Sequence, residues 1–241
     1  MSDPGPFSDP ARMASMEEEH RPLWRAYLRL LAPRLAPGIR LCDLGCNRGG
    51  LLSLLLEEGV PGAEAVRPSL AVGIDLPDLQ PHWSAAAPRS GAPRPLLFSS
   101  APSGSFPGQF DLVLSHEVVY LLEELKPVFG GVFSDLVPGG HFSFTTGCHR
   151  ENPLWPRWRA SLIASGLRVR DRGLEDYRQA LVATGFARIQ EERLRLTPED
   201  YREWVRTRST AAPDPAWFPG ADEEEEYYTR TGKMVLTSAR D

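Results

Sequence analysis

The chain has few of the residues on which several classes of protein depend. It contains three cysteines, Cys42, Cys46 and Cys148, with no Cys-x-x-Cys pair and no histidine pair at metal-ligand spacing. This argues against a disulfide framework and against a metal site. No apolar run approaches the ~20 residues of a membrane helix, and the N-terminus lacks the basic-then-apolar order of a signal peptide. We therefore expect a cytoplasmic protein with no membrane partner.

Positive charge is also in deficit. The 241 residues include 27 Lys and Arg against 32 Asp and Glu, which gives a net charge of −5 at pH 7. This balance argues against wide, nonspecific nucleic-acid binding, although a local basic site stays open. Lysine occurs only at Lys126 and Lys233. A hydrophobic fraction of 41% is ordinary for a globular protein, and the length suits one α/β domain with a sizeable core.

The most informative stretch is residues 39–58. An apolar run ends at Asp43 and Leu44, glycines follow at Gly45, Gly49 and Gly50, and an apolar helical run comes next. Such glycines allow tight turns and close approach of a ligand, and the helix start offers free N–H groups to an anion. The order predicts a nucleotide site at the end of a strand, with a plain strand–turn–helix as the alternative. The dinucleotide pattern G-x-G-x-x-G is broken at Asn47.

Two further runs end in the same way. Residues 70–76 predict a second strand with Asp75 at its tip, where a carboxylate can accept hydrogen bonds from ribose hydroxyls; a solvated turn acid is the alternative. Residues 95–100 predict a third strand. Residues 109–122 form a near-continuous apolar run with His116 and Glu117 inside it, as expected for a buried central strand and the residues just after it. A helix at 123–136, a turn at 137–140 and a strand at 141–146 complete this order.

These features together resemble a known family. Asp43-Leu44-Gly45-x-x-x-Gly49 is similar to motif I of the class I, Rossmann-like, S-adenosylmethionine (SAM)-dependent methyltransferases, and the Phe110-Asp111-Leu112-Val113 run is similar to their motif IV. The L-x-P-G-G turn before residue 141 is a further likeness. The resemblance implies a three-layer α/β/α sandwich with a mostly parallel seven-stranded sheet and an antiparallel last strand, here at 233–238. It also implies one domain over residues 11–241. The Pro, Gly, Asp and Ser content of residues 1–10 predicts a disordered tail before that domain.

The resemblance implies SAM as the cofactor and assigns residues to each part of it. By this resemblance Ser115 borders the methyl group. Ser100 stands where the family tends to have an acidic or amide residue that contacts adenine, and a hydroxyl or a backbone carbonyl could make that contact here. The implied cofactor-binding residues are Asp43, Gly45, Cys46, Asn47, Gly49, Asp75, Leu76, Ser100, Ala101 and Ser115.

Methyl transfer needs in-line placement of nucleophile, methyl and sulfur, and needs a base only when the acceptor is protonated or a poor nucleophile. His116 is the first candidate, with Tyr120 one helical turn further on, to shape or deprotonate the acceptor. The alternatives are that His116 contacts cofactor backbone atoms and that Glu117 caps a helix start. His149 is a second candidate base, or else a surface loop residue.

The remaining segments give weaker expectations. Residues 11–31 predict an N-terminal helix, either unbroken or divided at Pro22, and a short helix is expected around 83–87. Substrate-facing insertions are expected near 147–173 and 197–226. Their residues allow an aromatic wall or simple core anchors (Trp155, Trp158, Trp204 and Trp217), a basic segment (Arg157, Arg159, Arg168, Arg170 and Arg172), and an acidic run (Glu223 to Glu226).

The sequence therefore predicts methylation of a nitrogen or oxygen of a small-molecule acceptor. An RNA or protein methyltransferase is the first alternative, because the basic segment permits it. A noncatalytic module that binds SAM or S-adenosylhomocysteine is the second.

Overall fold

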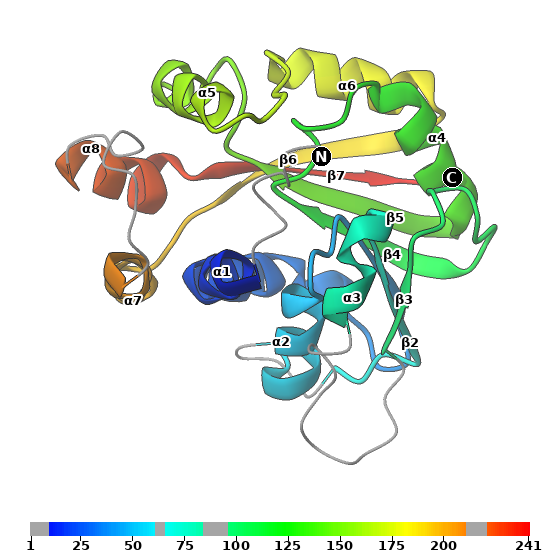
Figure 1. Ribbon diagram of the computed structural model, residues 1–241. Helices are drawn as coiled ribbons and strands as arrows, with labels where there is room; N and C mark the ends of the chain where they lie inside the picture. The colour runs from blue at the N-terminus through cyan, green and yellow to red at the C-terminus, as the bar shows by residue number, and fades with distance from the viewer. Residues whose placement is uncertain (1–9, 61–65, 84–95, 211–220) are drawn as a thin grey trace.

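The computed structural model describes residues 10–60, 66–83, 96–210 and 221–241, and within them one twisted sheet has helices on both faces (Figure 1). The strand order is β3-β2-β1-β4-β5-β7-β6. The strands are β1 (Arg40–Leu44), β2 (Leu70–Ile74), β3 (Leu96–Ser99), β4 (Phe110–His116), β5 (Leu136–Thr146), β6 (Ala187–Leu194) and β7 (Lys233–Ala239).

Strands β3, β2, β1, β4 and β5 pair in parallel, and β7 pairs antiparallel with both β5 and β6. The prediction of a mostly parallel seven-stranded sheet with an antiparallel last strand is confirmed. The parallel register brings the carboxyl ends of β1, β2 and β4 to one edge, because Asp43 stands opposite Gly73 and Leu114. In open α/β sheets this edge is where ligands bind.

Helices cover both faces of the sheet. Short helical turns supplement them at η1 (Ala32–Arg34), η2 (Pro77–Leu79) and η5 (Tyr227–Thr231), the last of which is a π-helix. The α-helices are α1 (Pro10–Leu31), α2 (Gly50–Glu58), α3 (Gln80–Trp83), α4 (Leu125–Asp135), α5 (Trp155–Ala164), α6 (Leu174–Ala183), α7 (Pro198–Thr210) and α8 (Ala221–Glu226).

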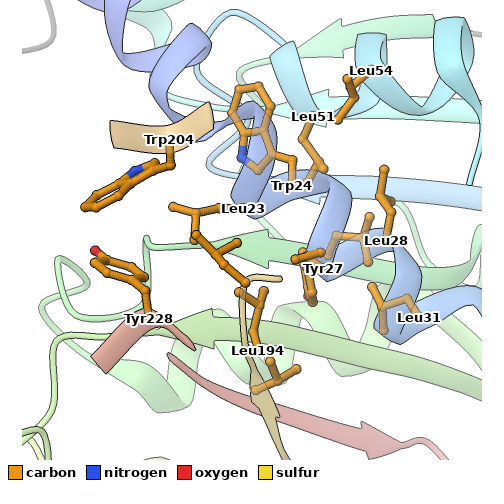
Figure 2. Packing of buried hydrophobic residues seen from close by; sticks show 14 of the residues in the cluster. Leu23, Trp24, Tyr27, Leu28, Leu31, Leu51, Leu54, Leu194, Trp204 and Tyr228 are labelled. Atoms are coloured by element: carbon orange, nitrogen blue, oxygen red, sulfur yellow. The ribbon is translucent and has the colours of Figure 1, made fainter. Parts of the chain in front are cut away.

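Helix α1 is held mainly by burial of one side. Its residues at positions 23, 24, 27, 28 and 31 follow helical spacing and pack against side chains of α2, β6, α7 and η5 (Figure 2). Pro22 lies inside this helix without dividing it, so the two-piece alternative is wrong. The ring removes one backbone hydrogen bond, at a cost of about 3 kcal/mol. Burial of Leu23, Tyr27, Leu28 and Leu31 offsets that cost.

Other local predictions differ from the structure in detail. The described helical residues near Trp83 end at Trp83, with η2 and α3 before it, while residues 84–87 lie outside the described part. The expected turn at 137–140 lies within β5, because Arg240, just after β7, pairs with both Gly139 and Gly140 through its backbone. Residues 1–9 and Trp217 are also outside the described part.

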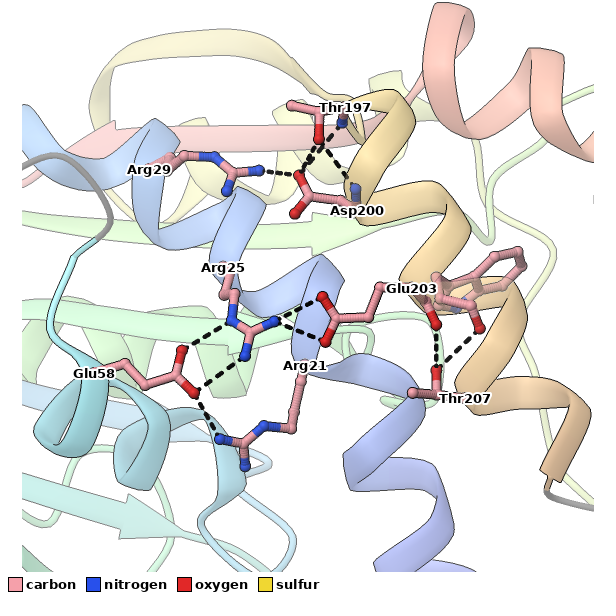
Figure 3. A network of polar contacts seen from close by, with 9 residues as sticks. Arg21, Arg25, Arg29, Glu58, Thr197, Asp200, Glu203 and Thr207 are labelled. Atoms are coloured by element: carbon pink, nitrogen blue, oxygen red, sulfur yellow. Dashed lines mark hydrogen bonds and ion pairs between the residues drawn. The ribbon is translucent and has the colours of Figure 1, made fainter.

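Ion pairs join α1 to two neighbouring helices (Figure 3). Arg25 lies 2.8 Å from Glu58 of α2 and 2.9 Å from Glu203 of α7. Arg21 also pairs with Glu58, and Arg29 pairs with Asp200 at the start of α7. Helices from the beginning and the end of the chain are thereby tied together.

We expect Arg25→Gln to lower the free energy of unfolding by about 1 kcal/mol, because it breaks an exposed contact with Glu58 and a partly buried one with Glu203 at once. Urea denaturation followed by circular dichroism measures the change. Lys126→Gln removes the same charge from an exposed position on α4 and is the control. Equal stability of the two variants would show that the Arg25 pairs do not fasten α1.

Candidate active site

The loop after β1 takes its shape from Gly45. This residue has φ of +79°, and a Cβ added to it would lie 2.3 Å from Cγ2 of Val118, so a side chain is excluded by backbone and by space. Gly49, with φ of +88°, ends the loop as the residue before α2. Gly45 and Cys46 both donate backbone hydrogen bonds to the carbonyl of Ile74, which fixes the loop against the end of β2.

Asp75 organises the same loop from the end of β2. Its Oδ2 accepts a 2.6 Å hydrogen bond from the backbone N–H of Asn47, and its Oδ1 accepts a 2.7 Å bond from the N–H of Leu76. Asn47 itself adopts a positive φ of 51°. A carboxylate has further lone pairs, so Asp75 can accept from a ligand's hydroxyls while it holds the loop.

Asp43 is a buried acid with an incompletely compensated charge. It is 2% exposed, and burial together with the charge of Asp75 raises the pKa of Asp43 to about 8. Burial also raises the pKa of Asp75, against the hydrogen bonds from Leu76 and Asn47. Two neighbouring carboxyl groups, one buried and one half-buried, favour a cationic ligand, which would supply the missing positive charge.

Two polar atoms at the same loop lack hydrogen-bond partners in the described part of the chain. They are Oδ1 of Asn47 and Oε1 of Glu17, on α1. The carboxylate of Glu17 lies 3.9 Å from the guanidinium of Arg48, so α1 reaches over the loop. Buried polar groups are normally paired, and these two atoms fit the hydrogen-bond donors of a bound ligand such as the ammonium of SAM.

The far side of the loop has the predicted adenine residues. Leu76 is 69% exposed, so its apolar side chain is available to a ring. The hydroxyl of Ser100 accepts a 2.8 Å bond from Gln80, and the N–H of Ala101 donates to the hydroxyl of Ser99. Sequence reasoning missed the role of Trp83, whose indole N–H donates to the carbonyl of Asn47 at 3.0 Å.

Asp75→Ala is expected to abolish measurable SAM binding, because it removes the predicted ribose acceptor and releases the N–H of Asn47 at the same time. Isothermal titration calorimetry of wild type and variant measures this. Asp111→Ala is the matched control, since Asp111 is an aspartate bonded to Arg40 at the other end of the sheet. Equal affinity in wild type and Asp75→Ala would remove Asp75 from the cofactor site.

His116 ends β4 and lies under α1. Its ring is 5.6 Å from that of His20 and 6.0 Å from that of Tyr27, measured between centroids. Its Nδ1 lies 2.9 Å from the hydroxyl of Thr145, and its Nε2 is buried with no hydrogen-bond partner among the described residues. Burial, His20 and Lys233 all lower the pKa of His116, so the imidazole is neutral at pH 7. Ser115, next to it, donates to the carbonyl of Leu44 at 2.9 Å.

Tyr120 does not lie where the sequence predicted it. Residues 117–124 form a bend and turn, with α4 starting at Leu125, so Tyr120 is not one helical turn beyond His116. Its buried hydroxyl has Cys148 as a hydrogen-bond partner, and burial raises the pKa of Tyr120. The expectation that Glu117 caps a helix start is also wrong, because α4 begins several residues later.

His149 is buried, at 1% exposure, which excludes the surface-loop alternative. Its Nδ1 lies 3.1 Å from Oε2 of Glu151, and its Nε2 has no partner in the described residues. Burial lowers the pKa of His149 despite Glu151. His149, in the loop after β5, therefore stays a candidate base with a neutral imidazole.

A buried ion pair that sequence reasoning missed lies beside these histidines. Nζ of Lys233, 6% exposed, is 3.3 Å from Oε1 of Glu117, 11% exposed. Glu117 also accepts a 2.9 Å bond from the N–H of Gly147. Burial acts to lower the pKa of Lys233, but Glu117, Tyr227 and Cys148 together raise it above its ordinary value. The one sequence signal was that Lys233 is one of only two lysines.

Aromatic rings surround this pair. The ammonium of Lys233 lies 5.9 Å from the ring centre of Trp158 and 5.7 Å from that of Tyr228. The hydroxyl of Tyr227 is buried without a partner in the described residues. A Cβ added to Gly147 would lie 3.2 Å from that hydroxyl, which places Tyr227 beside the loop after β5. Trp155 and Trp204 are buried in the same hydrophobic cluster.

The charged segments of the predicted insertions are partly used within the fold. Arg157 pairs with Glu223, and Arg170 pairs with Glu123. Arg172 donates to backbone carbonyls of residues 119 and 123. Glu224 is buried at 3% exposure, so the acidic run is not wholly a solvated face. In the described part of the chain no helix is long and apolar enough to span a bilayer, and no residue cluster suits a metal ion.

Comparison with known proteins defines the class. Residues 16–191 match the family model described as a methyltransferase domain, which is more than half of the chain. The chain belongs to this family and is a SAM-dependent methyltransferase of class I. SAM is its cofactor, in agreement with structural neighbours solved with SAM or S-adenosylhomocysteine.

One curated relative is the nocamycin O-methyltransferase of Saccharothrix syringae, 33% identical over 132 residues. The match covers 53% of this chain and 44% of the relative, so the chain spans less than half of that protein's length.

Solved structures of low sequence identity share the fold. A chain from the complex between the Haloferax volcanii Trm112 methyltransferase activator and a putative methyltransferase superposes with a TM-score of 0.73, at 19% identity and 99% coverage of both chains. The geranyl diphosphate C-methyltransferase of Streptomyces coelicolor A3(2) gives 0.64, at 15% identity, with 90% of this chain and 79% of that chain covered.

Proposed function

We propose that the protein transfers a methyl group from SAM to a nitrogen or oxygen of a small-molecule acceptor at the carboxyl ends of β4 and β5. One observation carries the proposal. His116, whose Nε2 is buried and unpaired within the described residues, lies between the motif I loop and the buried group formed by Glu117, Lys233 and Tyr227. Unpaired buried polar atoms are costly, and an acceptor's polar group would pair with them.

SAM supplies a methyl group already activated by its sulfonium, so the chain's main task is placement and exclusion of water. Asp43 would hold the ammonium, the loop from Gly45 to Gly49 would meet the methionine end, and Asp75 would accept from the ribose. Helix α1 brings Trp24 and His20 against His116, which keeps bulk water from the reacting atoms.

The burial of the residues around His116 supports a small acceptor over a macromolecule. Rings of Trp24, Trp158 and Tyr228 are buried around the candidate base and its neighbours. The basic segment that permitted RNA binding is engaged at Arg157, Arg170 and Arg172. A flat RNA or protein surface would reach His116 only after α1 moved away.

Oxygen is the acceptor atom that these features favour. The curated relative is named an O-methyltransferase, and a hydroxyl is an acceptor that has to lose a proton. A neutral imidazole whose Nε2 is unpaired can take that proton. The buried ammonium of Lys233 would also disfavour a charged amine close to it, although Glu117 offsets part of this repulsion.

The test is a panel of acceptors with radiolabelled SAM, comprising phenols, carboxylic acids, primary amines, total RNA and protein lysate. We expect label on an alcohol-type or phenolic oxygen of a small molecule. Label on RNA or protein alone would overturn the small-molecule assignment. Micromolar binding of SAM without turnover on any acceptor would favour the noncatalytic module instead.

A further inference from the structure

The hydrogen bonds around Glu117 have a fixed direction. Its Oε1 accepts from the N–H of Gly147 at 2.9 Å and lies 3.3 Å from the ammonium of Lys233. A backbone N–H and a charged ammonium can only donate, so both keep Glu117 as an acceptor. The 3.3 Å ion pair with Lys233 and the bond from Gly147 therefore both occupy lone pairs of Oε1.

The hydroxyl of Thr145 links Glu117 to His116 and determines which ring nitrogen of His116 carries the hydrogen. Its hydroxyl oxygen is 3.4 Å from Oε1 of Glu117 and 2.9 Å from Nδ1 of His116. A hydroxyl has one hydrogen to donate, and the carboxylate has none. When Thr145 donates to Glu117, its oxygen is left to accept, and Nδ1 of His116 must carry the hydrogen. The other ring nitrogen, Nε2, is then a bare lone pair.

Neighbours on α1 do not supply a hydrogen to that lone pair. His20 uses its Nδ1 on the carbonyl of Met16 at 2.6 Å, and burial lowers the pKa of His20 to about 4, so its Nε2 carries no hydrogen. Tyr27 donates its hydroxyl hydrogen to Ser143 at 3.0 Å. Nε2 of His116 is consequently available to a new donor.

We propose that Glu117 and Thr145 are positioning residues that hold His116 in its Nδ1–H tautomer, so that Nε2 takes the proton of an acceptor hydroxyl. This deepens the proposed function and rests on it. Lys233 has the supporting role of keeping Glu117 an acceptor. The reaction class is thereby narrowed to O-methylation.

The proposed step balances in atoms and electrons. The acceptor O–H bond breaks and its proton binds Nε2 of His116, while an oxygen lone pair forms the O–CH₃ bond. The C–S bond breaks, and its electrons return to sulfur, which leaves as the neutral thioether of S-adenosylhomocysteine. The imidazolium formed on His116 is stabilised by the carboxylate of Glu117 through the hydroxyl of Thr145, until the proton is lost to water.

The backbone conformation of Glu117 is consistent with a role in positioning its side chain. This residue has φ of +58°, a left-handed conformation that non-glycine residues rarely adopt. Its own N–H donates to the carbonyl of Thr145 at 3.2 Å, which ties the two positioning residues together.

The test uses nitrogen-15 NMR of the full-length protein labelled at its five histidines, without an acceptor. Long-range nitrogen–proton correlations distinguish Nδ1–H from Nε2–H tautomers, and His116→Gln identifies the signals of His116. We expect wild-type His116 in the Nδ1–H form. Thr145→Val and Glu117→Gln are expected to lose most of that form, while Thr145→Ser retains it.

An Nε2–H tautomer in the wild type would overturn the proposal, whatever the variants do. An unchanged Nδ1–H tautomer in folded Thr145→Val would also overturn it. Calorimetric titration of the same sample with SAM distinguishes failure of the proposed tautomer from failure of the proposed methyl transfer. Failure to bind SAM would refute the proposed methyl transfer, whereas a wrong tautomer with intact SAM binding would refute only the relay.

Discussion

Asp43→Asn is expected to weaken SAM binding about 100-fold, which corresponds to ~3 kcal/mol. The substitution keeps the size of the side chain and removes the buried negative charge that would face the ammonium. Calorimetry measures the affinity, and Asp111→Asn is the control because its carboxylate pairs with Arg40 away from this loop. A loss of less than threefold in Asp43→Asn would show that Asp43 does not meet the ammonium.

The pH dependence of SAM binding gives a second readout of the same residue. In the unliganded protein the pKa of Asp43 is raised to about 8, and SAM would bind the ionised form. Affinity should therefore fall as pH falls, by about 20-fold between pH 7.5 and 6.0. In Asp43→Asn this slope should be lost, and a slope retained in that variant would assign the titration to another group, of which Asp75 is the nearest.

The free energy of unfolding changes with pH in the opposite direction to the affinity for SAM. Because folding raises the pKa of Asp43 above its ordinary value of 3.8, the folded state keeps a proton that the unfolded state releases. This group therefore lowers the free energy of unfolding as pH rises from about 4 to about 8. Asp43→Asn should melt at a higher temperature than wild type at pH 8 without SAM, as measured by calorimetric scanning. A lower melting temperature would contradict the burial of an uncompensated charge.

His116→Gln is expected to lower turnover about 100-fold or more on the oxygen acceptor found in the panel, with SAM affinity unchanged. Glutamine retains the hydrogen bond to Thr145 but cannot take a proton at neutral pH. The measurement is the initial rate of label transfer at saturating SAM.

His141→Gln is the control, because His141 of β5 stands opposite Leu112 of β4, away from the carboxyl ends of both strands. His149→Gln tests the second candidate base. Loss of turnover in that variant but not in His116→Gln would move the base to His149 and its partner Glu151. Unchanged turnover in both would exclude a histidine base.

The order of strands and helices and the loop at Gly45 could be predicted from the sequence. Those features are local: a near-continuous apolar run predicts a central strand, and glycines directly after a strand predict a tight turn. Asp43 and Asp75 could be placed at one edge because parallel strands bring their carboxyl ends together. The cofactor-binding side of the candidate site could therefore be proposed from the sequence.

The acceptor side of the site depends on the tertiary structure. Lys233 and Glu117 are far apart in the sequence and meet only because β7 is inserted beside β5. Likewise, α1 passes over the end of β4 and brings His20 against His116, and burial together with His20 lowers the pKa of His116. Contacts between distant segments depend on how strands are ordered and helices pack, and no local pattern of residue types encodes them. This is why the sequence proposed His116 as a base but could not show which groups hold it.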